Sequence, residues 1–189
     1  MRIILASASP RRREILTQLG LNFEIVVSDA EESSNLTDAG KLCKELSKIK
    51  AHSVAKKIAD NNALIIGCDT VVVKNGKILG KPKDEADAFN MLSALSGGEH
   101  SVISGLTLIH GDKVISKYEE TRVLFDDMSK DEIMAYIATG ECTDKAGAYA
   151  IQGLAAPYIK GIKGCYYNVV GLPVNLLYNM AKELNLNLF

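Results

Sequence analysis

The sequence predicts an α/β protein built on a mixed β-sheet, because strand-like and helix-like segments alternate along its 189 residues. Residues 63–73 are almost continuously Ile, Leu and Val, as expected of a buried strand. Residues 39–58 carry apolar side chains at helical spacing. The Asn75-Gly76 pair indicates a tight hairpin turn, so part of the sheet should be antiparallel.

The remaining elements follow from the same periodicities and from their boundary residues. Residues 140–171 are rich in Gly, Tyr and small side chains, and no element is assigned to them. In chain order, we expect a strand at residues 3–5, a helix that Pro10 opens, a strand at 23–27, the helix at 39–58, the strand at 63–73 with its hairpin arm at 78–79, a helix at 84–95, strands at 100–110 and 114–125, a helix near 130–139, and a last helix from Pro173 to about residue 184.

The length of residues 1–189 suits one domain or two tightly joined lobes, and the composition is that of an ordinary globular protein. Apolar residues make up 47% and charged residues 24%, and the net charge is -1. A general nucleic-acid-binding protein would carry a basic excess over the whole domain, so this class is excluded. No apolar run is long enough to cross a bilayer, and the charged start lacks the apolar core of a signal peptide. We therefore expect a cytosolic protein that contacts no membrane.

The cysteines and histidines do not form a zinc-binding pattern. No Cys-x-x-Cys pair occurs, and no histidine lies close to a cysteine pair, so we expect four reduced thiols. Any metal should then be a hard ion with oxygen ligands, and Mg²⁺ or Mn²⁺ fits best. The residues concerned are Cys43, Cys68, Cys142, Cys165, His52, His100 and His110.

The first strand leads into a segment that has the composition of an anion site. Ser7 and Ser9 offer hydroxyl groups, Ser9 is a good N-cap, and Pro10 suits the first helical position. The N–H groups of the first helical turn would lie beside the guanidinium groups of Arg11–Arg13. Phosphate is the natural ligand of such a helix N-terminus.

Helical geometry separates the three arginines. Arg12 falls at the centre of the apolar stripe that Ile15, Leu16 and Leu19 define, whereas Arg11 and Arg13 flank it. An inward guanidinium needs an anion or a carboxylate partner. Arg12 therefore either binds phosphate or forms a salt bridge with an Asp or Glu at the edge of the core.

Asp69 is the sharpest single signal, because it interrupts an otherwise apolar strand and needs a cation or neighbouring backbone N–H groups. Lys50 shares a helix face with Leu46 and Val54, which turns it toward the body of the protein, although a lysine on such a face often only snorkels. Lys81 lies in an extended Gly-Lys-Pro segment that could hold an ammonium group in place.

The acidic loop around residues 28–34 supplies candidate metal ligands. Glu31 and Glu32 are ordinary solvated loop residues by composition, but a magnesium-nucleotide enzyme needs one or two carboxylates for its metal. The chain has no Walker-type phosphate loop, no Gly-x-Gly-x-x-Gly turn and no Gly-x-Ser-x-Gly elbow. The phosphate site is therefore of another type.

Five ordered motifs, spread over essentially the whole chain, make this sequence resemble the Maf family. They are Ser-Ala-Ser-Pro-Arg-Arg at residues 7–12, Cys-Asp-Thr-Val-Val at 68–72, Gly-Lys-Pro at 80–82, Asp-Lys-Ala-Gly-Ala-Tyr-Ala-Ile-Gln-Gly at 144–153, and Asn-Val-Val-Gly-Leu-Pro at 168–173.

The resemblance implies a nucleoside triphosphate pyrophosphatase that depends on a divalent metal and cleaves between the α and β phosphates. The family is linked to cleansing of the nucleotide pool and to restraint of septum formation. Its fold is similar to that of the inosine triphosphate pyrophosphatases: an elongated, bent mixed β-sheet flanked by helices in two lobes, with a central nucleotide-binding cleft. Homodimers are common in it.

The resemblance also implies roles for individual residues. It gives phosphate binding to Ser7 and Arg12, with Arg11 and Arg13 as helpers, and catalysis to Asp69, Lys50, Lys81 and Glu32. Glu32 and Asp69 would hold the metal. Thr70 and Gln152 would read the base, and with the arginine pair they resemble the family branch that acts on dTTP and UTP.

Two positions depart from the family pattern. Glu31 stands where aspartate is usual, which leaves open whether Glu31 or Glu32 binds the metal. Cys142 stands where proline is usual. Two other functions remain as alternatives: a nucleotide-sensing regulator of cell division that acts through a protein partner, and a nucleotidyltransferase, which should show a Gly-rich opening turn instead of Ser-Ala-Ser-Pro.

Overall fold

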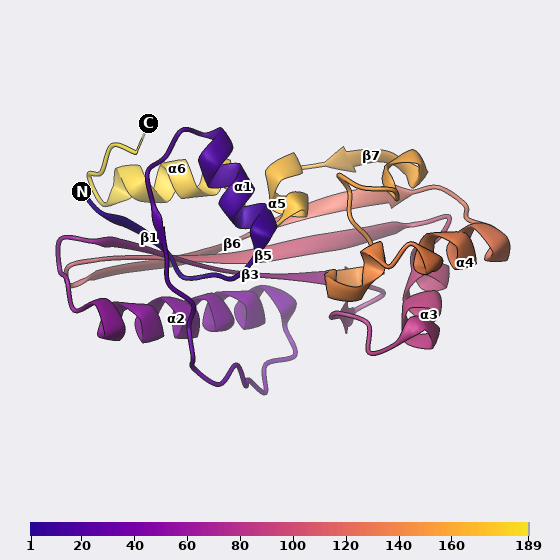
Figure 1. Ribbon diagram of the computed structural model, residues 1–189, viewed down its shortest axis with the longest axis horizontal. Helices are drawn as coiled ribbons and strands as arrows, with labels where there is room; N and C mark the ends of the chain where they lie inside the picture. The colour runs from indigo at the N-terminus through magenta and orange to yellow at the C-terminus, as the bar shows by residue number, and fades with distance from the viewer. Residues whose placement is uncertain (189) are drawn as a thin grey trace. The chain divides into compact units, whose positions relative to one another are not determined.

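The apolar runs of the sequence form one mixed β-sheet in the computed structural model, which describes residues 1–188 (Figure 1). The strand order is β2-β1-β3-β5-β6-β7, and β4 pairs with β3. Strand β1 is parallel to β2 and to β3, whereas β4 and β7 pair antiparallel with β3 and β6. The strands are β1 (Ile3–Leu5), β2 (Glu24–Ile25), β3 (Leu64–Lys74), β4 (Lys77–Leu79), β5 (Glu99–His110), β6 (Lys113–Phe125) and β7 (Ile159–Lys163).

The long helices begin and end close to where the sequence predicts them. Pro173 is the N-cap of the last helix instead of its first residue. Strand β2 has two residues where five were expected, and β7, α5 and three short 3₁₀ turns lie in the Gly-rich segment to which no element was assigned. The helices are α1 (Pro10–Gln18), α2 (Ala39–Ile58), α3 (Glu85–Leu95), α4 (Lys130–Ala138), α5 (Tyr166–Val170) and α6 (Val174–Glu183), and the 3₁₀ turns are η1 (Glu141–Asp144), η2 (Ala146–Ala148) and η3 (Ala156–Tyr158).

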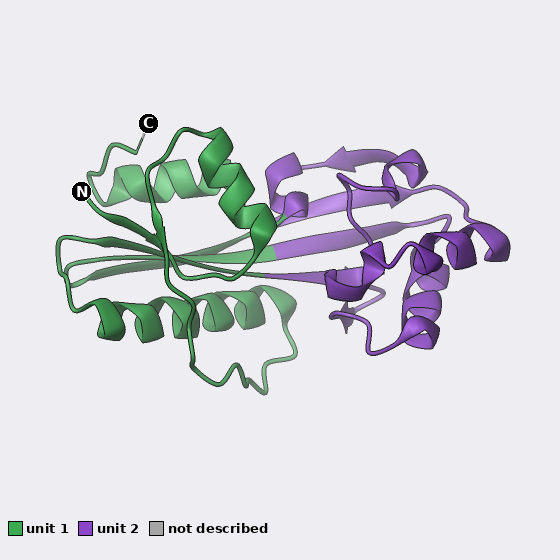
Figure 2. Ribbon diagram, viewed as in Figure 1, with its two compact units in different colours: residues 1–69, 104–119, 171–189 green, residues 70–103, 120–170 purple. Residues whose placement is uncertain are grey.

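The chain divides into two compact units, coloured separately in Figure 2. Unit 1 comprises residues 1–69, 104–119 and 171–189, and unit 2 comprises residues 70–103 and 120–170. The unit boundaries fall inside β3, β5 and β6, so each of these strands contributes residues to both units.

In unit 1, α2 covers one face of the sheet, and α1 and α6 cover the other (Figure 1). The apolar face of α2 packs on the strands through a buried cluster. Two strand glycines permit this contact: a Cβ on Gly67 would lie 2.3 Å from the Ser47 carbonyl oxygen, and one on Gly105 would lie 2.1 Å from that of Cys43. The cluster consists of Ile4, Ala6, Ala51, Val54, Ala63, Ile65 and Ile109.

Unit 2 has a core of its own, which α3 and α4 share with the adjoining parts of β3, β5 and β6. Both helices have a side-chain cap at the N-terminus. The Asp84 side chain accepts from the Asp87 backbone N–H, and Ser129 and Glu132 form a reciprocal capping box. The core includes Leu92, Leu95, Val123, Phe125, Tyr136 and Tyr149.

Candidate active site

The carboxyl end of β1 brings the N-terminal motif next to the central strand of the sheet. Leu5 pairs with Ile66 in parallel register, and the Ala6 N–H donates to the Ile66 carbonyl at 2.8 Å. Ser7 follows at the end of β1, and Asp69 comes three residues after Ile66 on β3. Ligands of α/β sheets bind at the carboxyl ends of such strands.

Helix α1 begins at Pro10, with Ser9 at the N-cap, as predicted. The expected capping bond is absent, because the Ser9 side chain makes no hydrogen bond to the first turn. The backbone N–H of Ser9 instead donates to Ser7 Oγ at 3.2 Å. Ser7 therefore organises the turn between β1 and α1.

Arg12 is the inward arginine, as the helical phase predicts. Its exposed fraction is 8%, whereas Arg11 is half-buried and Arg13 is exposed. Arg12 Nη1 donates to Ser7 Oγ at 2.9 Å, and Nε donates to the Gly171 carbonyl at 2.8 Å. These two acceptors hold the guanidinium group in a fixed orientation.

Lys50 joins two of the predicted carboxylates. Its ammonium nitrogen lies 2.6 Å from Asp69 Oδ1 and 2.9 Å from Glu32 Oε2. The Lys50 and Asp69 side chains are only 13% and 14% exposed, whereas Glu32 is 44% exposed. Because Lys50 and Asp69 are largely withdrawn from water, the attraction between their charges is screened less than in a surface salt bridge.

The contact with Lys50 separates the two loop glutamates. Both glutamates are exposed, and Glu32 forms the salt bridge with the ammonium group that also binds Asp69. Glu32 and Asp69, the two residues predicted to bind a hard metal ion, therefore both contact the Lys50 ammonium group. Two carboxylates in such an arrangement suit Mg²⁺ or Mn²⁺ when phosphate oxygens complete the coordination. No group of three or more His, Cys, Asp and Glu side chains able to hold a metal occurs within residues 1–188.

Gly171 connects the two clusters of unit 1, and sequence reasoning gave it no role. Its carbonyl accepts from Arg12 and also from the Cys68 thiol, at 3.4 Å, and Cys68 precedes Asp69. Gly171 has a φ of 127°, a backbone conformation that residues with a side chain rarely adopt. The sequence signal that could have found it is a glycine in the last of the five motifs, just before Leu172-Pro173.

The other predicted residues belong to unit 2. Thr70 follows Asp69 on β3 and is half-buried, and Lys81 is exposed. The Gly147 N–H donates to the Gly80 carbonyl at 3.0 Å, which ties the Gly-Lys-Pro segment to the late Gly-rich motif. Gln152 is exposed in that same motif. Hydrogen bonding within unit 2 therefore connects the segments that carry Lys81 and Gln152.

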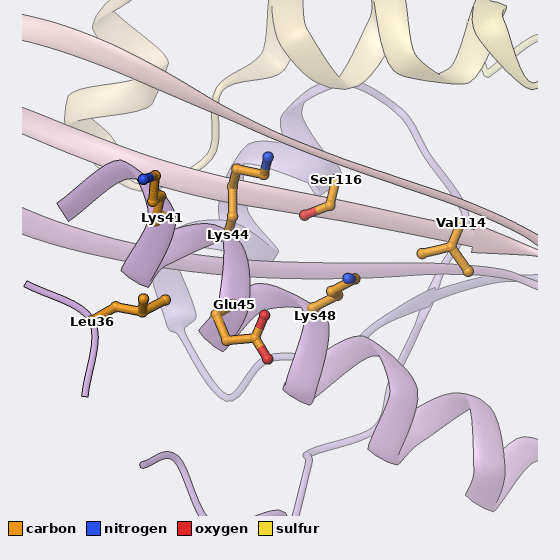
Figure 3. Close-up of a pocket in the computed structure, with 7 residues that line it drawn as sticks. All are labelled: Leu36, Lys41, Lys44, Glu45, Lys48, Val114 and Ser116. Carbon is orange, nitrogen blue, oxygen red and sulfur yellow. The ribbon is translucent and has the colours of Figure 1, made fainter. Parts of the chain in front are cut away.

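A groove of about 510 Å³ also lies in unit 1, and none of the predicted site residues lines it (Figure 3). Figure 3 shows its lysines on successive turns of α2, opposite β6. Its one hydroxyl group, on Ser116, continues into a buried chain through Thr107, at 2.9 Å, to Ser47, at 2.7 Å. The lining residues are Leu36, Lys41, Lys44, Glu45, Lys48, Val114 and Ser116.

None of the helices within residues 1–188 is long and apolar enough to cross a membrane. The four cysteines are free thiols, as expected.

Comparison with known proteins identifies the family. The dTTP/UTP pyrophosphatase of Clostridium botulinum strain Okra is 51% identical over 191 residues, with 98% of each chain covered. That of Ruminiclostridium cellulolyticum is 50% identical, with 97% of this chain and 96% of the relative covered. The Staphylococcus aureus Ham1 protein has the same fold, with a TM-score of 0.54 at 13% identity over 97% of this chain and 99% of that one. The family described as Maf-like protein matches residues 2–184, and the chain therefore belongs to the Maf family.

Proposed function

We propose that this protein hydrolyses dTTP and UTP between the α and β phosphates, releasing the nucleoside monophosphate and pyrophosphate. The proposal rests on Maf relatives that are named dTTP/UTP pyrophosphatase and share about 50% sequence identity with this chain over nearly its full length. The reaction would cleanse the nucleotide pool. We place it in the cytosol, with the homodimer that the family resemblance implies, and with neither nucleic acid nor membrane as a partner.

Asp69 is the general base of the proposed mechanism. Its carboxylate takes a proton from the attacking water, the new P–O bond forms at the α phosphorus, and the bond to the bridging oxygen breaks, so that pyrophosphate leaves. Lys50 Nζ lies 2.6 Å from the Asp69 carboxylate and so fixes its orientation. This pairing supports the assignment of Asp69, because a base must be positioned to act.

Arg12, Lys50 and Lys81 neutralise the charge that builds on the phosphate oxygens in the transition state. Ser7 orients the phosphate chain through its hydroxyl group, and Arg11 and Arg13 add positive charge beside it. The hydrogen bonds of the Arg12 guanidinium group to Ser7 and Gly171 support this role, because they set its orientation.

Glu32 and Asp69 would hold the divalent cation. When bound, Mg²⁺ or Mn²⁺ would supply Lewis-acid stabilisation of phosphate oxygens. Glu32 is preferred over Glu31, because Glu32 shares Lys50 with Asp69. Thr70 and Gln152 would read the base, and the Gln152 amide suits thymine or uracil because it presents one donor group and one acceptor.

The test is release of pyrophosphate and monophosphate from dTTP, UTP, CTP and 7-methyl-GTP, with Mg²⁺ or Mn²⁺ present. We expect preferential cleavage of dTTP and UTP. Asp69→Asn should lower kcat about 10²- to 10⁴-fold, because the general base is lost while the size of the side chain is kept. Asp112→Asn, in the exposed turn between β5 and β6, is the matched control and should keep full activity.

Two other outcomes would overturn the proposal. Nucleotide binding without release of pyrophosphate by the wild type would favour the regulatory sensor that acts through a protein partner. Transfer of the nucleotidyl group to an acceptor other than water would favour a nucleotidyltransferase.

A further inference from the structure

The exposed Gln152 side chain is presented by a short turn in unit 2. The Gly153 N–H donates to the Ala150 carbonyl at 3.1 Å, which closes a turn with Ile151 and Gln152 at its two central positions. A turn held by this bond alone would leave the Gln152 side chain loosely placed. The contacts on either side of the turn therefore decide how well Gln152 is positioned.

Tyr136 and Glu141 hold both ends of this turn. The Tyr136 hydroxyl accepts from the Ala150 N–H at 3.3 Å and donates to Glu141 Oε2 at 2.8 Å. The Glu141 carboxylate accepts from the Leu154 N–H, at 3.1 Å from Oε1 and 3.0 Å from Oε2. One hydrogen-bonded pair thus binds the residue before Ile151 and the residue after Gly153.

The pair is itself firmly anchored. Tyr136 belongs to α4 and lies in the core of unit 2. Burial, together with the hydrogen bond to Glu141, raises the pKa of Tyr136, so its hydroxyl stays protonated and continues to donate. Glu141 is the first residue of η1, and its own backbone N–H donates to Thr139 Oγ1 at 3.2 Å.

Gly153 is explained by the same carboxylate. A Cβ on Gly153 would lie 2.0 Å from Glu141 Oε1, so any side chain there would displace Glu141. Gly153 does not have a positive φ, and steric contact, not backbone conformation, accounts for the glycine. The Gln152-Gly153 sequence and Glu141 therefore fit one another.

We propose that Glu141, held by Tyr136, is a positioning residue for base selection: it fixes the Ala150–Leu154 turn so that the Gln152 amide meets the base in one orientation. The inference rests on the proposed function, in which Gln152 reads thymine or uracil. It assigns a role to the carboxylate and to the tyrosine hydroxyl, neither of which the mechanism above uses.

The first test measures kcat and KM for UTP and CTP in the wild type and in Gln152→Ala, Glu141→Ala and Tyr136→Phe. We expect Glu141→Ala to lower the preference for UTP over CTP about tenfold, as one lost hydrogen bond would. The loss should appear mainly in the KM for UTP. The double variant with Gln152→Ala should lose no more preference than Gln152→Ala alone, because both changes remove the same interaction.

Two matched variants separate positioning from simple destabilisation. Glu141→Gln keeps an oxygen that accepts from the Leu154 N–H and should recover part of the preference. Asp131→Asn, on the exposed first turn of α4, should leave it unchanged. If Glu141 were only structural, Glu141→Ala would lower the activity on UTP and CTP equally.

The Gly153→Ala variant tests the steric fit. As a single substitution, Gly153→Ala should lower the preference for UTP and speed hydrogen exchange at the Leu154 amide, because the new methyl group displaces the Glu141 carboxylate. In the Glu141→Ala background the same change should have little further effect on either measurement. Equal effects of Gly153→Ala in both backgrounds would contradict the proposed fit.

Failure of this inference is distinguishable from failure of the proposed function. Unchanged UTP preference in Glu141→Ala, alongside a lowered one in Gln152→Ala, overturns the inference alone. If the wild type hydrolyses no triphosphate, the proposed function fails. The inference is then tested by measuring the affinities for the α,β-methylene analogues of UTP and CTP. Glu141→Ala should lower the ratio of the UTP-analogue affinity to the CTP-analogue affinity. An unchanged ratio would show that Glu141 does not position Gln152.

Discussion

His100 shows how the core sets the charge of a single residue. It is 3% exposed, packs against the rings of Phe125 and Tyr149, and has Nε2 2.8 Å from the Tyr149 hydroxyl. Burial, with a smaller effect from the Lys74 charge, lowers the pKa of His100 to about 4 from 6.5. The imidazole is therefore neutral in the folded protein at physiological pH.

This shift predicts acid destabilisation. Above pH 6.5 His100 is neutral in both states, whereas below it the unfolded chain takes up a proton that the folded protein refuses until about pH 4. The free energy of unfolding should therefore decrease as the pH is lowered. At about pH 4.5, protonation of His100 in the unfolded chain should account for about 2 to 3 kcal/mol of this decrease. Urea unfolding at pH 7 and pH 4.5 should show a smaller difference for His100→Gln than for the wild type. The exposed His52→Gln is the control, and equal differences in all three proteins would contradict the assignment.

Single residues were predictable from the sequence where helical phase determines their burial. The inward positions of Arg12 and Lys50 follow from the apolar residues that share their faces. The hydrogen-bonding partners were harder to predict from the sequence. The Gly171 carbonyl group that accepts from Arg12, for example, lies 159 residues away along the chain. The role of Gly171 depends on this distant contact. The contacts of Glu141 with Tyr136 and Leu154 are nearer along the chain, but they join separate short elements, and no sequence period indicates them.

At the scale of elements, the close approach of α2 to the sheet is what places Lys50 beside Asp69. Gly105→Ala should disturb it, since the new Cβ would lie 2.1 Å from the Cys43 carbonyl oxygen. We expect a loss of about 1 to 3 kcal/mol in the free energy of unfolding, typical of overpacking, and a lower kcat. Gly161→Ala on β7 is the matched control, because a Cβ there meets no atom within 4 Å. Equal denaturant midpoints for the two variants would show that α2 does not need the glycine.

Elements with a clear period or boundary signal were predictable, and short ones were not. The helix at Ala39–Ile58 and the Asn75-Gly76 turn, with φ values of 50° and 75°, match their predictions. Strand β7 and helix α5 span five residues each within a Gly-rich segment, too few to show a period. Strand β7 exists because it pairs with β6, which is a tertiary cause.

At the scale of the whole molecule, alternation of elements predicted the α/β class, but it could not predict which strands are neighbours. Strand β1 lies between β2 and β3, and β3 pairs on its other side with β5, a choice made by packing of distant segments. The positions of the unit boundaries could not be predicted either, because they fall inside continuous strands, such as between Asp69 and Thr70 in β3.

The shared strands predict that the two units unfold together. Strands β3, β5 and β6 each run from one unit into the other. Unfolding of unit 2 alone would therefore unfold part of each of these strands. The backbone hydrogen-bonding groups at the new strand ends would lose their partners, which costs free energy. Hydrogen exchange across a urea titration should give one midpoint for peptides from α2 in unit 1 and α4 in unit 2. Gly105→Ala lies in unit 1, yet it should lower both midpoints by the same amount. Exchange of α4 at a lower urea concentration than α2, or a shift confined to α2 in the variant, would show that the units unfold separately despite the strands they share.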